Sequence, residues 1–223
     1  MNHYLAFFDD SVKETPVRGF LHRPGVFGAD CLILTHGAGA NCDAPLLVAL
    51  ADRFCATGLT VLRCDLPFRQ SRLHGPPPRG SAERDQQGLR AAIESMRRHV
   101  SGRVFLGGHS YGGRQASMLA AAEPGLVQRL LMLSYPLHPP RRPDDLRTGH
   151  FSHLQTPALF VHGTRDSFAS SAEMAAALKL IPVQTEQFTI TGAGHELATT
   201  KNRDEVSQSV VEAFRSFAND WTS

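Results

Sequence analysis

A serine flanked by glycines stands where an apolar run gives way to a helical pattern. The sequence GHSYG at 108–112 has the form G-x-S-x-G, comes after the apolar run 104–106 and precedes a helical pattern over 114–123. A serine at such a strand-to-helix turn lies on a sharp, strained bend that presents its hydroxyl above the sheet. The pattern therefore predicts Ser110 as a nucleophile. The plainer alternative is a glycine-rich turn with an incidental serine.

A nucleophilic serine needs a base and an acid that orients the base. At a G-x-S-x-G turn these come in the chain order serine, acid, histidine, each on a loop after a strand. Asp166 comes after the apolar run 158–161, and His195 comes after a predicted strand that ends at Ile190. We therefore predict Asp166 as the acid and His195 as the base. Alone, either residue would more often be structural, as a turn aspartate or a surface histidine.

Acyl chemistry at a serine also needs N–H donors for the negative oxygen that develops on the substrate. One donor is expected from the backbone N–H of Tyr111, the residue after the nucleophile. The loop THGAGA at 35–40 comes directly after the apolar run 31–34 and is expected to supply the second. We assign the second donor to the Ala38 N–H, with Gly39 as the neighbouring alternative. A glycine turn that leads into the next helix is the plainer interpretation.

The elements that must position these residues are indicated by apolar runs that alternate with helical patterns. Strands are predicted at 31–34, 61–62, 104–106, 130–133 and 158–161, and also at 4–8, 17–22 and 187–190. Near-continuous apolar runs of this length are typical of parallel strands covered on both faces. The fold class is therefore α/β, with a mostly parallel, twisted sheet of about seven or eight strands and helices on both faces.

End signals and apolar spacing predict three of the helices. The first has Asp43 as its cap, Pro45 in its first turn and Gly58 as its stop, and the second begins after a Ser81 cap. The last helix opens at Asp204. The core-facing residues of the second and last helices are Leu89, Ala92, Ile93, Met96 and Val100, and Val206, Val210, Phe214 and Phe217.

Two stretches, 65–80 and 134–157, are rich in proline and arginine and have neither helical nor strand periodicity. Neither separates segments that look able to fold alone, so we interpret both as loops within a single domain of residues 1–223.

The segments THGAGA, GGHSYGG, SYPLHPP, HGTRDSF and GAGHE together resemble the α/β-hydrolase superfamily, and more narrowly its small, nearly lidless dienelactone-hydrolase-like branch. The chain is similar over essentially its whole length to short bacterial proteins related to the hydrolase-like domain of a eukaryotic chromatin-complex subunit. The resemblance implies the nucleophile at Ser110, the acid at Asp166 and the base at His195. Dienelactone hydrolases resemble one another in having a cysteine nucleophile, so the serine here argues against that substrate.

The resemblance also bears on access to the site. In this superfamily a lid usually comes after the strand that here ends at Tyr135. The segment available before the next strand is too short for a substantial helical cap. We therefore expect a minimal cap or none, an open site, and small soluble substrates.

Composition narrows the class of partner. The 223 residues carry a net charge of +2 with 20% charged residues, which argues against nucleic acid or a membrane surface as the main partner. No apolar run approaches the roughly 18 residues of a membrane span. Residues 1–10 do not resemble a secretory signal. We expect a small-molecule ester as the substrate and a cytoplasmic location, and the sequence leaves the oligomeric state open.

The cysteines and the remaining histidines give no sign of a metal or a cofactor, and we predict neither. Cys31, Cys42, Cys55 and Cys64 lack CxxC spacing and are expected to be reduced thiols. Cys42 lies near the THGAGA loop, but nothing suggests an activated thiolate. His150 and His153 have no third ligand and are interpreted as surface residues.

Several other residues near the predicted site have two interpretations. His109 and His162 are expected to be packed supports rather than second bases, and the Tyr111 side chain either lines the acyl pocket or packs in the core. A set of arginines could attract an anionic substrate, although we favour a solvated basic rim. These arginines are Arg63, Arg69, Arg72, Arg79, Arg114, Arg141 and Arg142.

The leading hypothesis from the sequence is a serine hydrolase that cleaves carboxylic esters, thioesters or lactones through an acyl-enzyme on Ser110. Two alternatives remain open. One is a non-catalytic scaffold with the hydrolase fold, and the other is an acyltransferase or perhydrolase that uses the same three residues.

Overall fold

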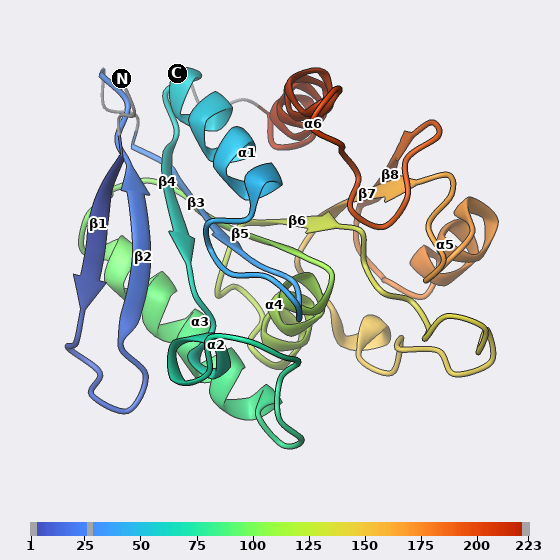
Figure 1. Cartoon of the computed structure of the whole chain (residues 1–223), viewed down its shortest axis with the longest axis horizontal. Helices are drawn as coiled ribbons and strands as arrows, with labels where there is room; N and C mark the ends of the chain where they lie inside the picture. The colour runs from blue at the N-terminus through green and yellow to red at the C-terminus, as the bar shows by residue number, and fades with distance from the viewer. Residues whose placement is uncertain (1–3, 26–28, 220–223) are drawn as a thin grey trace.

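An eight-stranded sheet forms the centre of the protein (Figure 1). The computed structural model describes residues 4–25 and 29–219. The strand order is β1-β2-β4-β3-β5-β6-β7-β8; β1 and β2 pair antiparallel, as do β2 and β4, and the other pairs are parallel. The strands are β1 (Tyr4–Asp9), β2 (Val17–His22), β3 (Cys31–Thr35), β4 (Thr60–Cys64), β5 (Val104–His109), β6 (Arg129–Leu133), β7 (Ala158–Gly163) and β8 (Thr185–Ile190). The predicted mostly parallel α/β sheet is confirmed.

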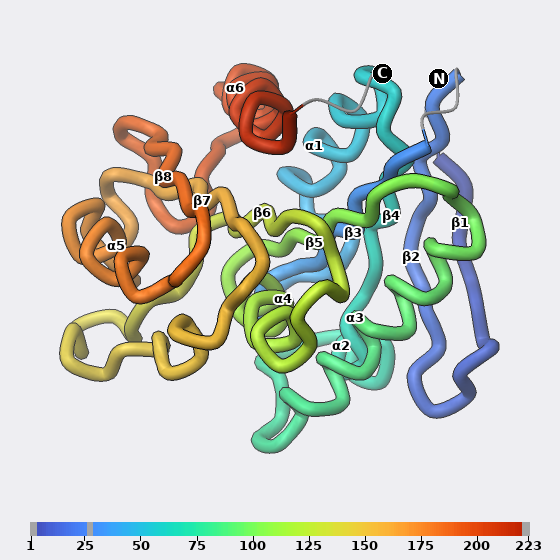
Figure 2. Tube along the Cα trace, turned by 180° about the vertical axis from the view of Figure 1, so that it is seen from behind, coloured from blue at the N-terminus to red at the C-terminus, as the bar shows by residue number. Residues whose placement is uncertain are grey.

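Helices cover both faces of this sheet (Figures 1 and 2). On one face, α1 (Pro45–Ala56) and α6 (Arg203–Phe217) share an apolar core with the strands. The opposite core contains α3 (Ala82–Arg97), α4 (Tyr111–Ala122) and α5 (Ser171–Leu178). Two short helices, α2 (Pro67–Ser71) and η1 (Phe151–His153), interrupt loops. The central strands are therefore buried on both sides, as their continuous apolar runs predict.

The alternation of side chains in β3 shows how one strand serves both cores. Leu32 and Leu34 belong to the core of α1 and α6, whereas Cys31 and Ile33 belong to the core of α3, α4 and α5. All four are fully buried. Successive side chains of a strand point to opposite faces, so a strand between two helical layers must be apolar at every position.

The ends of α1 agree with the sequence only in part. Pro45 stands in the first turn, and Gly58, with a φ of 93°, comes after the helix end, as predicted. Asp43 is not the cap, however. Ala44 holds that position without a side-chain hydrogen bond, and Asp43 instead forms an ion pair with Arg63.

The start of α3 shows a similar partial agreement, because Ser81 has the cap position but makes no capping hydrogen bond. The two proline- and arginine-rich loops contain α2 and η1, which the absence of periodicity concealed. Helix α5 is a further element that the apolar spacing does not predict, although Ser170 and Glu173 form a reciprocal capping box at its start. This S-x-x-E signal is present in the sequence.

The segment between β6 and β7 has the expected small size. Among its residues, all of which the structure describes, the helical part is η1, three residues long. Within the described ranges, no helical cap covers the edge of the sheet at which β5 and β7 end.

The packing of α6 on the sheet gives a stability prediction. Phe214 is fully buried, with its ring edge-on to Phe54 at 5.8 Å and to Phe105 at 5.6 Å. We expect Phe214→Ala to lower the free energy of unfolding by about 3–5 kcal/mol, measured by urea denaturation. Phe8→Ala is the matched control, because Phe8 is 59% exposed, and it should cost less than about 1 kcal/mol. Equal losses in the two variants would contradict this account of the core.

Candidate active site

The three residues predicted to do chemistry lie together at one edge of the sheet. Ser110 directly succeeds β5, Asp166 lies three residues after the end of β7, and His195 comes after β8. These strands are parallel neighbours or near neighbours in the sheet, so their carboxyl ends open on the same edge. Loops at that edge are where open α/β sheets commonly bind ligands.

Ser110 has a backbone conformation that residues other than glycine rarely adopt. Its φ of 51° and ψ of −115° turn the chain from His109, the last residue of β5, into Tyr111, the first of α4. Strain of this kind persists only where neighbouring contacts hold it. Here the Ser110 N–H donates to the carbonyl oxygen of Leu133 in β6 at 2.8 Å.

Two glycines allow the strand and the helix to meet at this turn. A Cβ atom on Gly108 would lie 2.6 Å from the backbone of Gly112 and Gly113. A Cβ on Gly112 would lie 2.5 Å from the carbonyl oxygen of His36. Both distances are too short for any side chain, so the glycines of G-x-S-x-G are needed for the close approach that the sequence predicts.

A continuous set of hydrogen bonds joins the three side chains. Ser110 Oγ donates to His195 Nε2 at 2.8 Å. On the other side of the ring, His195 Nδ1 donates to the Asp166 carboxylate and lies 3.0 Å from Oδ1 and 2.9 Å from Oδ2. The two bonds together fix which ring nitrogen of His195 carries the proton. The Phe168 ring stacks on the imidazole, with 4.1 Å between ring centroids.

The Asp166 carboxylate is held in its charged form. Burial alone raises its pKa, but hydrogen bonds from His195 and from the Phe168 N–H outweigh burial and leave the pKa below its ordinary value. The Asp166 side chain is fully shielded from solvent, whereas that of His195 is 17% exposed. The buried carboxylate therefore holds the orientation of an imidazole that is partly open to the pocket.

The loop at 36–40 lies directly against Ser110. A Cβ on Gly37 would be 3.5 Å from the Ser110 Cβ, and Ala38 lines the same pocket as Ser110. The carbonyl oxygen of Gly37 accepts from His36 Nδ1 at 2.8 Å and from the Ala40 N–H at 3.2 Å. The peptide is planar and trans, so fixing this carbonyl also fixes the opposite direction of the Ala38 N–H.

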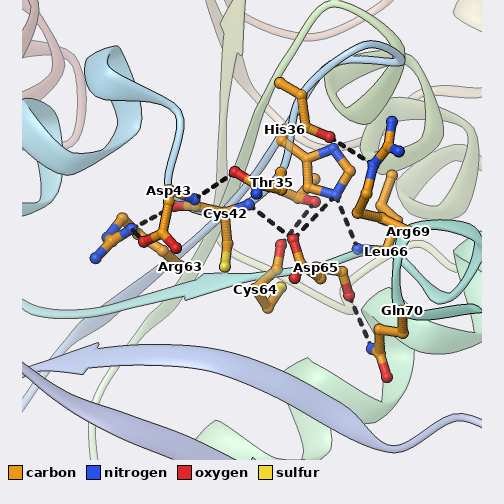
Figure 3. A network of polar contacts seen from close by, with 12 residues as sticks. Thr35, His36, Cys42, Asp43, Arg63, Cys64, Asp65, Leu66, Arg69 and Gln70 are labelled. Carbon is orange, nitrogen blue, oxygen red and sulfur yellow. Dashed lines mark hydrogen bonds and ion pairs between the residues drawn. The ribbon is translucent and has the colours of Figure 1, made fainter. Parts of the chain in front are cut away.

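A buried network of hydrogen bonds fixes the loop at 36–40 (Figure 3). The Leu66 N–H donates to His36 Nε2 at 3.1 Å, so the proton of the neutral ring is on Nδ1, facing Gly37. Burial lowers the pKa of His36 and keeps the ring neutral. Arg69 adds bonds from its guanidinium to the carbonyl oxygens of Ala40 at 2.7 Å and Ala38 at 2.8 Å.

The Tyr111 side chain both lines the pocket and packs beneath it. Its hydroxyl donates to Asp85 at 2.7 Å, and its ring stands edge-on to Phe68 at 5.7 Å. The Phe68 N–H donates to the other Asp85 oxygen at 3.0 Å. The packing interpretation is therefore confirmed, and the same residue also lines the pocket; a role in binding an acyl group stays a prediction.

A pocket of about 1180 Å³ opens above Ser110. The exposed face of α4 and the two proline- and arginine-rich loops supply most of its wall. The lining residues are Ala38, Pro76, Pro77, Gln86, Ser110, Tyr111, Arg114, Met118, Ala121, Ala122, Pro136, Asp145, Leu146, Arg147, Gly149, His150, His153 and Phe168. Both loops that the sequence placed outside regular structure thus contribute to the site.

Comparison with known proteins agrees with this geometry. A model of the family described as "Alpha/beta hydrolase domain" matches residues 28–223. This chain belongs to the alpha/beta hydrolase family. The match spans most of the chain, from before β3 to beyond α6.

Solved structures of related fold include proteins that are described as hydrolases. XC6422 from Xanthomonas campestris, called an α/β serine hydrolase without lid, has a TM-score of 0.76 at 18% identity over 97% of this chain and 96% of its own. Est1E from Butyrivibrio proteoclasticus has a TM-score of 0.76 at 17% identity over 96% and 99%. A dienelactone hydrolase from Anabaena variabilis has a TM-score of 0.70 at 22% identity over 96% and 98%. At these identities the likeness establishes the fold alone, and the family match confirms the predicted α/β-hydrolase superfamily. The narrower dienelactone-hydrolase-like branch stays a prediction.

Two further histidines of this alpha/beta hydrolase support the site. His109 Nε2 donates to the backbone carbonyl oxygen of His195 at 2.9 Å, and His162 Nε2 donates to that of Ala169 at 2.9 Å. Burial lowers the pKa of both rings. Both lie against the site as packed, neutral residues.

The interpretation of the arginines as one solvated rim is wrong for two of them. Arg63 is fully buried and donates to His22 Nε2 at 2.9 Å and to the Cys42 carbonyl oxygen. Arg69 is 4% exposed, and its guanidinium donates to several backbone carbonyl oxygens, including that of Gly75 at 3.0 Å. Both arginines are buried because their guanidinium groups donate to backbone carbonyl oxygens of loops, and buried carbonyl groups need hydrogen-bond donors.

His150 also departs from its expected place. It is half-buried and lines the pocket, and its Nε2 lies 2.8 Å from the Ser117 hydroxyl. His153 is exposed, as expected, at the pocket margin. Phe168, Asp85 and Arg147 are not predicted from the sequence, because their roles depend on contacts between distant segments and leave no spacing signal.

The four cysteines are buried and free, and burial raises the pKa of the Cys42 thiol. Across residues 4–25 and 29–219, no group of three or more His, Cys, Asp or Glu side chains is placed to hold a metal ion. None of the helices in the same ranges is long and apolar enough to cross a membrane.

The environment of His150 gives a prediction about pH. Burial and then the nearby Arg114 charge lower the pKa of His150 to about 4. The ring therefore stays neutral in the fold but takes up a proton in the unfolded chain near pH 6.5. Its contribution to stability should fall as pH drops from about 6.5 to about 4.

NMR titration of the His150 ring tests this directly. We expect a midpoint near pH 4 that moves upward in Arg114→Gln, because one of the two causes of the shift is removed. Arg142→Gln is the matched control, since Arg142 is exposed and outside the pocket lining. A midpoint near 6.5 in the unsubstituted protein would contradict the burial of this ring.

Proposed function

We propose that this chain is a serine hydrolase that cleaves carboxylic esters, or thioesters or lactones, of small soluble substrates through an acyl-enzyme on Ser110. The observation that carries the proposal is the unbroken hydrogen-bonded series from Ser110 Oγ through His195 to Asp166, at 2.8 Å and 2.9–3.0 Å, on the wall of the pocket. In this proposal Ser110 is the nucleophile, His195 the base and Asp166 the acid.

The order of bond changes is set by these positions. As Ser110 Oγ bonds to the acyl carbon, His195 Nε2 takes the hydroxyl proton, and the carbonyl oxygen becomes negative. Asp166 keeps the ring oriented and stabilises the imidazolium without taking its proton. His195 then gives the proton to the leaving oxygen as the ester bond breaks. A water molecule, deprotonated by His195, releases the acid by the reverse sequence of steps.

The backbone N–H groups of Ala38 and Tyr111 are the proposed donors to the negative oxygen. Tyr111 is the first residue of α4, so its N–H has no acceptor within the helix and lies at the positive end of the helix dipole. The Ala38 N–H has its direction fixed by the bonds to the Gly37 carbonyl. Each such donor is worth about 2.7–4 kcal/mol of barrier.

The related structures support an ester substrate by analogy of fold. Est1E has been solved with ferulic acid bound, and XC6422 is described as lidless. Like XC6422, this chain has no helical cap over its described pocket, which favours substrates that reach Ser110 from solvent. We propose hydrolysis rather than acyl transfer, because a pocket of about 1180 Å³ without a cap admits water to the acyl-enzyme.

Labelling by a fluorophosphonate tests the nucleophile. The probe should modify the folded protein at Ser110, located by peptide mass spectrometry, because the neighbouring His195 makes this hydroxyl nucleophilic. Ser110→Ala should not be labelled. Ser117 provides an internal control, since its hydroxyl also lies beside a histidine but donates to the Arg114 carbonyl oxygen, and it should remain unmodified. Folded protein that resists the probe would contradict the proposal.

Turnover of 4-nitrophenyl acetate and butyrate separates an enzyme from a scaffold. We expect Ser110→Ala and His195→Ala each to lower kcat by at least about 10³-fold, and Asp166→Asn by about 10⁴-fold through loss of the correct tautomer. Circular dichroism and melting temperature establish that the variants fold. A rate unchanged by Ser110→Ala would identify background hydrolysis and favour the scaffold.

Substitution of His36 tests how the Ala38 donor is positioned. His36→Ala removes the bond to the Gly37 carbonyl and should lower kcat by up to about 10²-fold, with little change in KM. His36→Asn should recover part of the loss, because its amide N–H can donate to the same oxygen. If His36→Ala and His36→Asn lose the same amount of kcat as each other, and also the same amount of thermal stability, His36 has a structural role alone.

A further inference from the structure

Two arginines face the same pocket as Ser110. Arg114 lies one helical turn beyond Ser110 in α4, because its N–H donates to the Ser110 carbonyl oxygen at 3.0 Å. Arg147 lies in the loop between β6 and β7. The same loop contains η1, which packs against α4. Within the described part of the chain, ion pairs form at other arginines but not at these two.

The two arginines line the same pocket, and their guanidinium groups are incompletely bonded. Arg114 Nε is buried and has no hydrogen-bond partner among the described residues. Arg147 Nη1 makes a long contact of 3.4 Å to the Pro136 carbonyl oxygen. Burial and then the Arg114 charge lower the pKa of Arg147, which records the repulsion between the two cations. An anion between them would relieve that repulsion.

The backbone holds Arg147 in this position independently of its side chain. Its N–H donates to the Leu137 carbonyl oxygen at 2.8 Å, and its own carbonyl oxygen accepts from the Tyr135 hydroxyl at 2.7 Å. Tyr135 is 1% exposed, so this anchor belongs to the core. The pocket therefore presents the Arg147 guanidinium from a fixed point.

The other groups around the arginines do not neutralise them. His150 is neutral near pH 7, because burial and Arg114 lower its pKa to about 4. Asp145 is the acid that the pocket lining contains; it is exposed and forms no ion pair with either guanidinium group within the described ranges. Its charge opposes the lowered pKa of Arg147 without cancelling it. The wall one helical turn from Ser110 is therefore positively charged.

We propose that Arg114 and Arg147 form a subsite for an anionic oxygen group, carboxylate or phosphate, carried by the ester that reacts at Ser110. This proposal rests on the proposed ester-cleaving function and names its substrate class. Guanidinium groups bind both anions with paired hydrogen bonds. Four residues of helix span about 6 Å, so the anionic group belongs several bonds from the reacting carbonyl. The solvated-rim interpretation is kept for the exposed Arg141 and Arg142.

Paired esters test the subsite by turnover. Three kinds of substrate are compared. The first are the 4-nitrophenyl monoesters of adipic and suberic acids, and the second are their neutral methyl-ester analogues. The third is a 4-nitrophenyl ester of matched chain length that ends in a phosphate group. At low salt kcat/KM should favour the anionic esters by about 10- to 100-fold, a preference that salt weakens. Arg114→Gln and Arg147→Gln should remove most of this preference, whereas Arg142→Gln should keep it. The larger preference identifies carboxylate or phosphate as the favoured group.

Binding to an inactive variant tests the subsite without turnover. Calorimetry with Ser110→Ala measures the affinity for monomethyl adipate and for its dimethyl ester. Ser110→Ala combined with Arg114→Gln should bind the monoanion at least about 10-fold more weakly, and the combination with Arg142→Gln should bind it unchanged.

The outcomes separate this subsite from the proposed function. Neutral esters cleaved through Ser110, with no advantage from charge that depends on Arg114, would overturn the subsite and leave the hydrolase intact. Binding of monomethyl adipate that depends on Arg114, in a protein that cleaves no ester, would support the subsite and overturn the proposed ester cleavage. Binding of the monoanion that Arg114→Gln leaves unchanged would overturn the subsite.

Discussion

The close approach of β5 and α4 at Ser110 is the constraint on which the site depends. The turn requires a positive φ at Ser110 and leaves no room for a side chain at Gly108 or Gly112. Gly112 also meets the His36 carbonyl, so the same approach brings the loop after β3 to the serine. The strain is held by a sheet that is buried on both faces, because movement of β5 would disturb two apolar cores at once.

Buried polar side chains fix the backbone of the loop at 36–40 through hydrogen bonds. Placing His36 and Arg69 inside the protein costs desolvation, and the cost is offset because their N–H groups donate to the backbone carbonyl oxygens of Gly37, Ala38 and Ala40. Each carbonyl that is fixed in this way also fixes the N–H of the next residue. The directions of the two proposed donors therefore have different causes: the polar network fixes the Ala38 N–H, and the start of α4 fixes the Tyr111 N–H.

The sequence predicts those features that arise from local chemistry. The apolar run of β3, the glycines around Ser110 and the order Ser110, Asp166, His195 are visible directly, because parallel strands bring the loops at their carboxyl ends to one edge of the sheet. The expectation of a solvated Arg69 is wrong, since its burial depends on the turn of α2 and the folded loop beside it, which no periodicity records. Side chains such as Phe168 and Arg147 likewise gain their roles only from contacts between segments far apart in the chain.

The proposed anion subsite would orient a substrate in a pocket that has no helical cap within the described residues. In a pocket of about 1180 Å³ that is open to solvent, a few directional polar contacts can fix the orientation of a small ligand. Exposed charges such as Arg142 are screened within about 10 Å by salt and cannot orient a ligand strongly. Arg114 is partly buried, with its Nε shielded from solvent, and there a guanidinium keeps more of its attraction for an anion. The same helix that carries the strained serine therefore carries, one turn later, the charge that can align a substrate with it.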